Sequence, residues 1–153
     1  MAGLYFEEFF VGQTFKHDLR RTVTETDNLI FSAMTHNPAA LHLDEEYCRE
    51  NSEFGTRVVN SCFTLGLMVG ISVGDTTLGT TVANLGWDEV RFPKPLFHGD
   101  TVRVESEVAE IRESKSRPDN GIVIFIHRAF NQKGDLVASC KRSALMIRKV
   151  KAA

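Results

Sequence analysis

The spacing of hydrophobic positions changes once along this chain. From Ser61 to Gly74 nearly every residue is apolar or small, whereas after Gly79 apolar residues alternate with polar ones. A helical run without a polar face is typical of a buried helix, and a period of two is typical of half-buried strands. We therefore expect one central helix, followed by strands at residues 81–92, 100–113, 121–132 and 135–148.

The expected strands differ in how many of their faces are apolar. Val102, Val104 and Val108 alternate with polar residues at 103, 105 and 107, as in a strand with one solvated face, whereas residues 122–126 are apolar throughout. The second pattern places its strand at the centre of the sheet. The sequence thus predicts an α+β fold in which an antiparallel sheet wraps around a long central helix.

Shorter elements are expected before the central helix. Residues 14–23 predict an early, partly solvated strand. Thr24 and Asp27 have the spacing of a capping box, which predicts a helix to about Met34. Asp44 is the expected N-cap of a short helix that reaches about Glu50. Because no repeat or linker divides the chain, we expect one domain over residues 1–153.

Gly66 and Gly70 lie four residues apart in the central apolar run. In a membrane this spacing favours helix dimerisation. The run is shorter than the ~20 apolar residues that a membrane span needs, so we expect no membrane association. We expect the glycines instead to let strand backbones approach the helix closely.

Composition narrows the classes of partner. The formal charge is -2, and the lysines and arginines are scattered, which argues against a nucleic-acid surface. Three cysteines have no metal-binding spacing and are an odd number for a disulfide framework, so a cytoplasmic location is the simplest expectation. The first residues also lack the basic and apolar segments of a secretory signal.

The segment from Met34 to Asp44 carries the clearest chemistry. It places the amide of Asn37 and the imidazole of His42 five residues apart in a predicted loop. Such a loop can direct both side chains into one cleft, where a water molecule is held and deprotonated beside an activated double bond. This is the outline of a hydratase site.

The same segment resembles the signature of the MaoC-like (R)-specific enoyl-CoA hydratases and dehydratases of the hotdog superfamily. That signature reads Asp, any residue, Asn, Pro, an apolar residue, His, any residue, Asp. Leu41, His42 and Asp44 fit it, whereas Asn37 stands at the place of the catalytic Asp. Residues 58–62 and 90–100 extend the similarity over most of the chain. The subgroup acting on mesaconyl-CoA, methylmalyl-CoA or itaconyl-CoA looks most similar.

The resemblance implies a hydro-lyase that reversibly hydrates a short-chain 2-enoyl-CoA thioester, including branched or dicarboxylic C5 acyl groups. His42 would transfer the protons. The backbone amides of Ser61 and Cys62, at the start of the central helix, would stabilise the enolate as an oxyanion hole. Asn60 would contact the substrate or cap this helix. No cofactor is implied beyond the coenzyme A of the substrate, and we expect no metal.

Asn37 leaves two hypotheses open. An amide positions water but exchanges no proton at accessible pH, so either His42 alone handles protons or the chain is a binding protein without activity. A register shifted by one gap places Thr35 at the Asp position and supplies no carboxylate either. Asp44 is close in sequence, but we expect it to cap a helix.

Cations are needed for the anionic parts of such a substrate. Arg57 and Arg91 are candidates for the free carboxylate of a dicarboxylic acyl group, whereas Lys115 and Arg117 are candidates for the coenzyme A phosphates, or else belong to a solvated hairpin. We expect a homodimer or a dimer-based oligomer, because the sheet of one hotdog unit has an open edge and an incomplete cleft.

Two other functions remain as alternatives. A hotdog thioesterase would direct water at the carbonyl carbon, usually with a carboxylate base or nucleophile, and the loop offers none. A non-catalytic acyl-CoA binding protein would tolerate Asn37. Of the other histidines considered, His98 and His127 are expected to have structural roles, and His36 is expected to be exposed or a neighbour of the site and not a second base.

Overall fold

The computed structural model describes residues 3–149, so the outermost residues of the predicted domain, 1–2 and 150–153, lie outside it. Its sheet has six strands, in the order β1-β4-β5-β6-β3, and β2 pairs with β4. The strands are β1 (Thr14–Lys16), β2 (Arg21–Thr22), β3 (Thr81–Arg91), β4 (Thr101–Glu113), β5 (Asn120–Phe130) and β6 (Leu136–Ile147). The helices are α1 (Glu25–Met34), α2 (Ala40–Leu43), α3 (Glu45–Asn51) and α4 (Ser61–Thr76), with a 3-10 turn at Phe6–Glu8.

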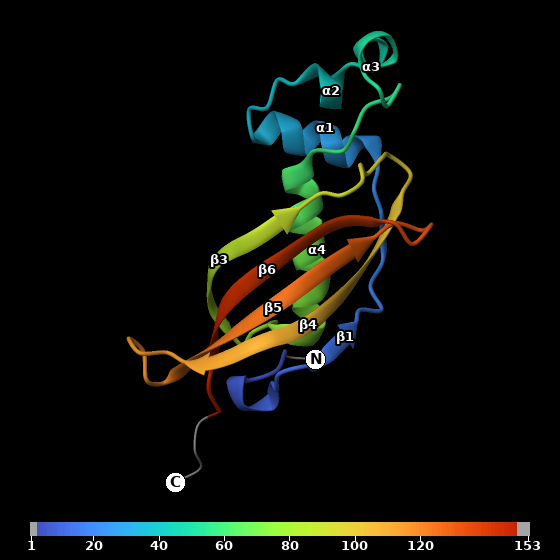
Figure 1. Ribbon diagram of the computed structural model, residues 1–153. Helices are drawn as coiled ribbons and strands as arrows, with labels where there is room; N and C mark the ends of the chain where they lie inside the picture. The colour runs from blue at the N-terminus through green and yellow to red at the C-terminus, as the bar shows by residue number, and fades with distance from the viewer. Residues whose placement is uncertain (1–2, 150–153) are drawn as a thin grey trace.

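One face of the sheet packs against α4, and the short helices gather at the start of α4. Figure 1 shows α4 running behind the strands, with α1, α2 and α3 above its N-terminal end. Met68 and Ile71 of α4 share one hydrophobic cluster with Val104, Ala129 and Val137 of the sheet. This cluster holds the helix against the sheet, as the predicted α+β arrangement requires.

The four long strands lie where the period of two predicts them, within two residues at each end. β5 lies between β4 and β6, and residues 121–125 are all buried. The prediction of a central strand from residues 122–126 is therefore confirmed. Both of its faces need apolar side chains, because α4 covers one face and Ile122, Ile124 and Leu145 form a second cluster with other partners.

The predicted strand at residues 14–23 is interrupted. It consists of β1 and β2, which pair with different parts of β4. Between them His17 turns its side chain inward, where Nδ1 lies 2.7 Å from an Asp75 carboxylate oxygen and Nε2 lies 2.8 Å from Ser106 Oγ. The predicted single strand was therefore too long. Between its two parts, the His17 side chain connects this segment to α4 and β4.

The glycines of α4 do not serve the predicted purpose. A Cβ atom placed on Gly66, Gly70 or Gly74 would meet no other atom within 4 Å. The sheet packs against the opposite side of the helix, through residues such as Thr64 and Met68. The expectation that strands approach these glycines is wrong, and α4 is covered on one side only within the described chain.

A buried polar layer crosses the core near the C-terminal half of α4. The His127 side chain is fully buried, and its Nδ1 lies 2.7 Å from Ser106 Oγ. Burial, and then the charge of Arg142, lower the pKa of His127 to about 3. Its Nε2 has no hydrogen-bond partner within the described residues. His127 is thus held neutral in the folded protein, in the structural role that the sequence predicts.

Acid should destabilise the fold through this histidine. An unfolded histidine titrates near 6.5 and His127 near 3 when folded, so its stabilisation is complete above pH 6.5 and is lost as the pH falls toward 3. Each such group lowers the free energy of unfolding by about 1.4 kcal/mol per pH unit inside that window. Burial also lowers the pKa of His98, which adds to the slope.

Urea unfolding at pH 7.5, 6.0 and 5.0 measures this slope above the range in which most carboxylates titrate. A His127→Gln variant should have a slope smaller by about one proton. An unchanged slope in this variant would show that His127 is not the titrating group.

Candidate active site

A tight turn after α1 places His42. Asn37 Oδ1 accepts a hydrogen bond from the Ala39 amide at 3.0 Å, which bends the chain into α2. His42 therefore lies on a one-turn helix and not in the predicted loop. Asp44 ends this turn and caps α3, where its side chain accepts from the Tyr47 amide at 2.9 Å. The predicted capping role of Asp44 is confirmed.

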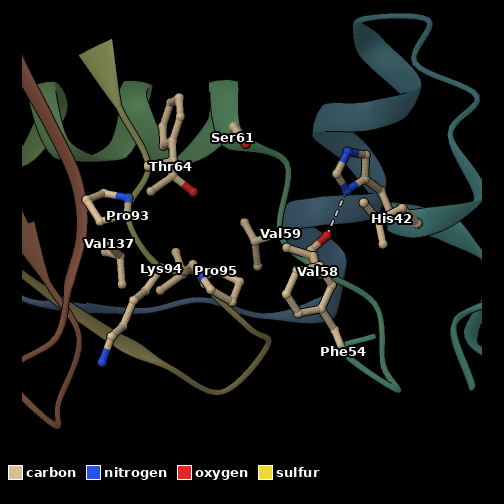
Figure 2. Close-up of a pocket in the computed structure, with 13 residues that line it drawn as sticks. His42, Phe54, Val58, Val59, Ser61, Thr64, Pro93, Lys94, Pro95 and Val137 are labelled. Carbon is tan, nitrogen blue, oxygen red and sulfur yellow. Dashed lines mark hydrogen bonds between the residues drawn. The ribbon is translucent and has the colours of Figure 1, made fainter. Parts of the chain in front are cut away.

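The His42 ring is fixed by the main chain. Its Nδ1 lies 2.7 Å from the carbonyl oxygen of Val58, drawn as a dashed line in Figure 2. A carbonyl only accepts hydrogen bonds, so in the neutral ring the proton sits on Nδ1 and Nε2 carries the lone pair. Nε2 makes no hydrogen bond to residues 3–149. The free nitrogen is therefore the basic one.

His42 opens into a cleft of about 380 Å³ beside the start of α4. Figure 2 shows Ser61 on the first turn of α4 and His42 on α2, with Val58 and Val59 between them. The lining residues are mostly apolar: Leu41, His42, Phe54, Val58, Val59, Ser61, Thr64, Phe92, Pro93, Lys94, Pro95, Leu96 and Val137. A mostly apolar cleft with a few polar groups suits a small organic ligand.

The first turn of α4 offers one of the two predicted amide donors. Asn60 is the N-cap, and its Oδ1 accepts from the Cys62 amide at 3.0 Å. That amide is already bonded, and Cys62 does not line the cleft. The Ser61 amide makes no hydrogen bond to the described residues. The predicted pair of donors is thus reduced to Ser61, and Asn60 has the capping role.

Asn37 does not share the cleft with His42 in a single chain. It is absent from the lining residues, and its side-chain oxygen is used in the turn before α2. The expectation that one loop directs both side chains into one cleft is therefore not met within the described chain. The sequence spacing of five residues could not show this, because the residues that line the cleft depend on the local turn and on how the elements pack.

Arg57 does not line the cleft either. Its guanidinium forms ion pairs with two carboxylates. Its guanidinium lies 2.8 Å from Glu25 and 2.9 Å from Glu45, and its side chain is only 14% exposed. The Glu25 interaction, followed by that of Glu45, raises the pKa of Arg57 against the effect of burial. Arg57 thus ties α1 to α3. Its position does not support the predicted contact with substrate.

The other predicted cations also lie outside the cleft. Arg91 is exposed, and its guanidinium donates to the carbonyl of its neighbour Val90 at 2.9 Å. Lys115 and Arg117 lie in the connection from β4 to β5, at the end of the sheet remote from α1–α3 (Figure 1). The lining cation is Lys94, whose Nζ lies 2.5 Å from Asp135. No feature of the sequence indicated Lys94, apart from its position within residues 90–100, which extend the family resemblance.

Asn28 was also missed from the sequence; it is a fully buried residue of α1 that contacts the Val58 carbonyl, which holds His42. Its only sequence signal is a polar residue on the inner side of α1. His98 contacts the same amide at 3.0 Å, in agreement with the structural role expected for it.

Residues 3–149 contain neither a candidate metal centre nor a candidate membrane helix. No group of three or more His, Cys, Asp or Glu side chains is arranged to hold a metal ion. None of the helices within these residues is long and apolar enough to cross a membrane.

Comparison with known proteins identifies the family. The MaoC like domain matches residues 8–126. The chain belongs to the MaoC-like family. It is 35% identical to a mesaconyl-CoA hydratase of Cereibacter sphaeroides over 148 residues, which are 97% of this chain and 42% of that protein. The MaoC-like chain therefore spans less than half the length of this relative.

Solved structures agree with this assignment. A MaoC-like dehydratase from Rhodospirillum rubrum matches with a TM-score of 0.83 and 28% identity, covering 97% of this chain and 99% of that one. A double-hotdog protein from Mycobacterium tuberculosis matches with a TM-score of 0.87 and 21% identity, covering 99% of this chain and 46% of that one. The fold of this MaoC-like chain is the hotdog fold, as predicted.

Proposed function

We propose that this MaoC-like chain catalyses the reversible addition of water to a short-chain 2-enoyl-CoA thioester. The observation that carries the proposal is the fixed ring of His42, which lines the cleft beside the start of α4 and whose Nε2 has no hydrogen-bond partner in the described chain. The names of the relatives, a hydratase and a dehydratase, support the same reaction class. Apart from the thioester substrate, the reaction requires no cofactor.

The reaction uses two groups of the cleft, the His42 imidazole and the Ser61 amide at the start of α4. His42 Nε2 takes a proton from water as the water oxygen bonds to C3 of the enoyl group. The C2–C3 π electrons move toward C2 and the thioester oxygen, where the Ser61 amide and the positive end of α4 stabilise the enolate. The proton on Nε2 then passes to C2. One water has been added, and dehydration is the reverse sequence.

A thioesterase is the less favoured function. Hydrolysis of the thioester usually uses a carboxylate as base or nucleophile, and no Asp or Glu is among the residues that line the cleft in the described chain. The apolar walls and a single imidazole suit addition to a double bond better. A binding protein without activity is separated from both by assay.

Hydration should depend on His42 and only weakly on Asn37. His42→Ala should lower kcat/KM by about 100- to 10,000-fold, the usual contribution of a general base. Asn37→Asp keeps the oxygen that accepts from the Ala39 amide and lies outside the cleft. It should change activity by less than about tenfold.

Loss of enoyl-thioester ultraviolet absorbance measures hydration, and thiol release measured in parallel reports hydrolysis. Thiol release by the wild type would favour the thioesterase. Activity that appears only in Asn37→Asp would indicate that the natural chain is a binding protein.

For the acyl group, we propose that Lys94 contacts the free carboxylate of a dicarboxylic C5 substrate such as mesaconyl-CoA. It is the lining residue with an ammonium group, and its contact with Asp135 would be replaced by one with the substrate. Arg57 cannot take this part without breaking two ion pairs.

Lys94→Met should therefore change substrate preference. A hydrogen bond to a charged group contributes about 1.5–3 kcal/mol, so kcat/KM for mesaconyl-CoA should fall by about 10- to 100-fold. The value for crotonyl-CoA, which has no second carboxylate, should stay nearly constant. Arg91→Met is the matched control and should leave both values unchanged. Equal losses on both substrates for Lys94→Met would exclude the contact.

We further propose that the protein is a homodimer joined through α4 and β3. β3 is the last strand in the sheet order and has no described neighbour on its outer side. Leu85 and Trp87 on it are 50% and 46% exposed. Between β3 and α4 runs a groove of about 490 Å³, lined by Val69, Val73, Thr77, Gly79, Thr81, Asn84, Trp87 and Arg142. A second copy would cover the open edge of β3 and the side of α4 that carries Gly66, Gly70 and Gly74.

Gly70→Glu tests this interface without disturbing the isolated chain. Space is open beside Gly70, and glutamate is a better helix former than glycine. The variant should change from the mass of two chains to that of one in light scattering after size exclusion. Leu19→Glu, which replaces another exposed apolar residue, should remain a dimer. A Gly70→Glu dimer as stable as the wild type would contradict the proposed interface.

A further inference from the structure

Asn28 is a polar side chain enclosed by the protein next to the proposed active site. It lies in the first half of α1, has no exposed surface, and does not line the cleft. A buried amide is costly unless its donors and acceptor are all bonded. Its partners therefore indicate what the side chain is there to hold.

The donor side of Asn28 holds the backbone that supports His42. Its Nδ2 lies 3.2 Å from the carbonyl oxygens of both His42 and Val58, and 3.0 Å from His98 Nε2. The Val58 oxygen is also the acceptor for His42 Nδ1, at 2.7 Å. One carbonyl oxygen thus receives the imidazole and the Asn28 amide together, which fixes its direction.

The acceptor side of Asn28 holds the start of α4. Its Oδ1 accepts from the backbone amide of Asn60 at 2.8 Å. Asn60 is the N-cap of α4 and in turn binds the Cys62 amide through its own side chain. The Ser61 amide, the proposed enolate donor, lies between these two bonded amides. Its direction is therefore set by the residues that Asn28 holds.

We propose that Asn28 is a positioning residue that fixes His42 and the first turn of α4 relative to each other. This inference rests on the proposed hydration reaction, in which His42 acts at C3 and the Ser61 amide at the thioester oxygen. Those two atoms of the substrate have a fixed separation. The base and the donor must match it, and an error of about 1 Å can cost about 100-fold in rate.

The Asn28 side chain donates to the carbonyl oxygens of His42 and Val58 and accepts from the Asn60 amide, and only an amide of this length can do both. An aspartate retains the acceptor for Asn60 but places a second acceptor against the carbonyl oxygens of His42 and Val58. A serine is neutral and shorter, so it reaches fewer of these partners. Asn28→Asp and Asn28→Ser therefore weaken the same set of bonds through different chemistry.

Both variants should lose turnover more than substrate affinity. We expect kcat for enoyl-CoA hydration to fall by about 10- to 100-fold, while KM changes little, since Asn28 does not contact the cleft. Asn120→Asp is the matched control, because Asn120 Nδ2 also donates to a main-chain carbonyl, that of Met146, at the other end of the sheet. Ser32→Ala, one turn along α1, removes a buried hydroxyl without a described partner. Both controls should keep wild-type kcat.

Nitrogen-15 NMR of the His42 ring gives a readout that loss of stability alone would not change. The wild type should show the neutral ring protonated at Nδ1, and the Asn28 variants should show a mixture of the two tautomers. This measurement does not depend on activity. If the wild type hydrates no enoyl-CoA but the tautomer responds to Asn28, the proposed function is wrong and the positioning role stands.

Two results would overturn the inference. One is a wild-type His42 ring protonated at Nε2, which needs no variant to fold. The other is wild-type kcat and a wild-type tautomer in folded Asn28→Ser. Reduced kcat with an unchanged His42 tautomer and an equal rise in KM would also contradict it, because that pattern describes general loosening of the cleft.

Discussion

The packing of α4 against one face of the sheet is the constraint on which the site depends. Met68 and Ile71 anchor the helix in the main hydrophobic cluster, so its N-terminal turn has a fixed place at one end of the sheet. The segment that leads into this turn supplies the Val58 carbonyl that holds His42. Hydrophobic packing in the core thereby sets the geometry of a polar site at the N-terminal end of α4. The buried polar layer with His127 lies near the other end of this helix.

The charges around the site are arranged to leave the cleft almost neutral. Arg57 is neutralised by Glu25 and Glu45, and these ion pairs join the short helices. Asp44 is used as a helix cap. The cleft with the imidazole therefore has mostly apolar walls and one lysine, and beside such walls a helix dipole acts on developing charge more strongly than in open water.

Near the C-terminal end of α4, polar side chains are buried in the core. There the core contains His17, Ser106, His127 and Arg142, which are linked only in part by hydrogen bonds. Burial lowers the pKa of both His127 and Arg142. Such a layer adds less stability than an apolar one would. Arg142 also lines the groove beside β3, so this part of the core reaches the surface that we assign to a second copy.

Local sequence determined the long strands, the helix caps and the identity of His42, because periodicity, capping and short motifs act over a few residues. The Thr24–Asp27 box and the Asp44 cap formed as predicted. Tertiary structure decided which side chains meet. It decided which residues line the cleft with His42, a set without Asn37 and Cys62, and it engaged Arg57 with carboxylates from two helices. It also brought Asn28 to residues 14 to 70 positions away, contacts that no local pattern encodes because they depend on how separate elements pack.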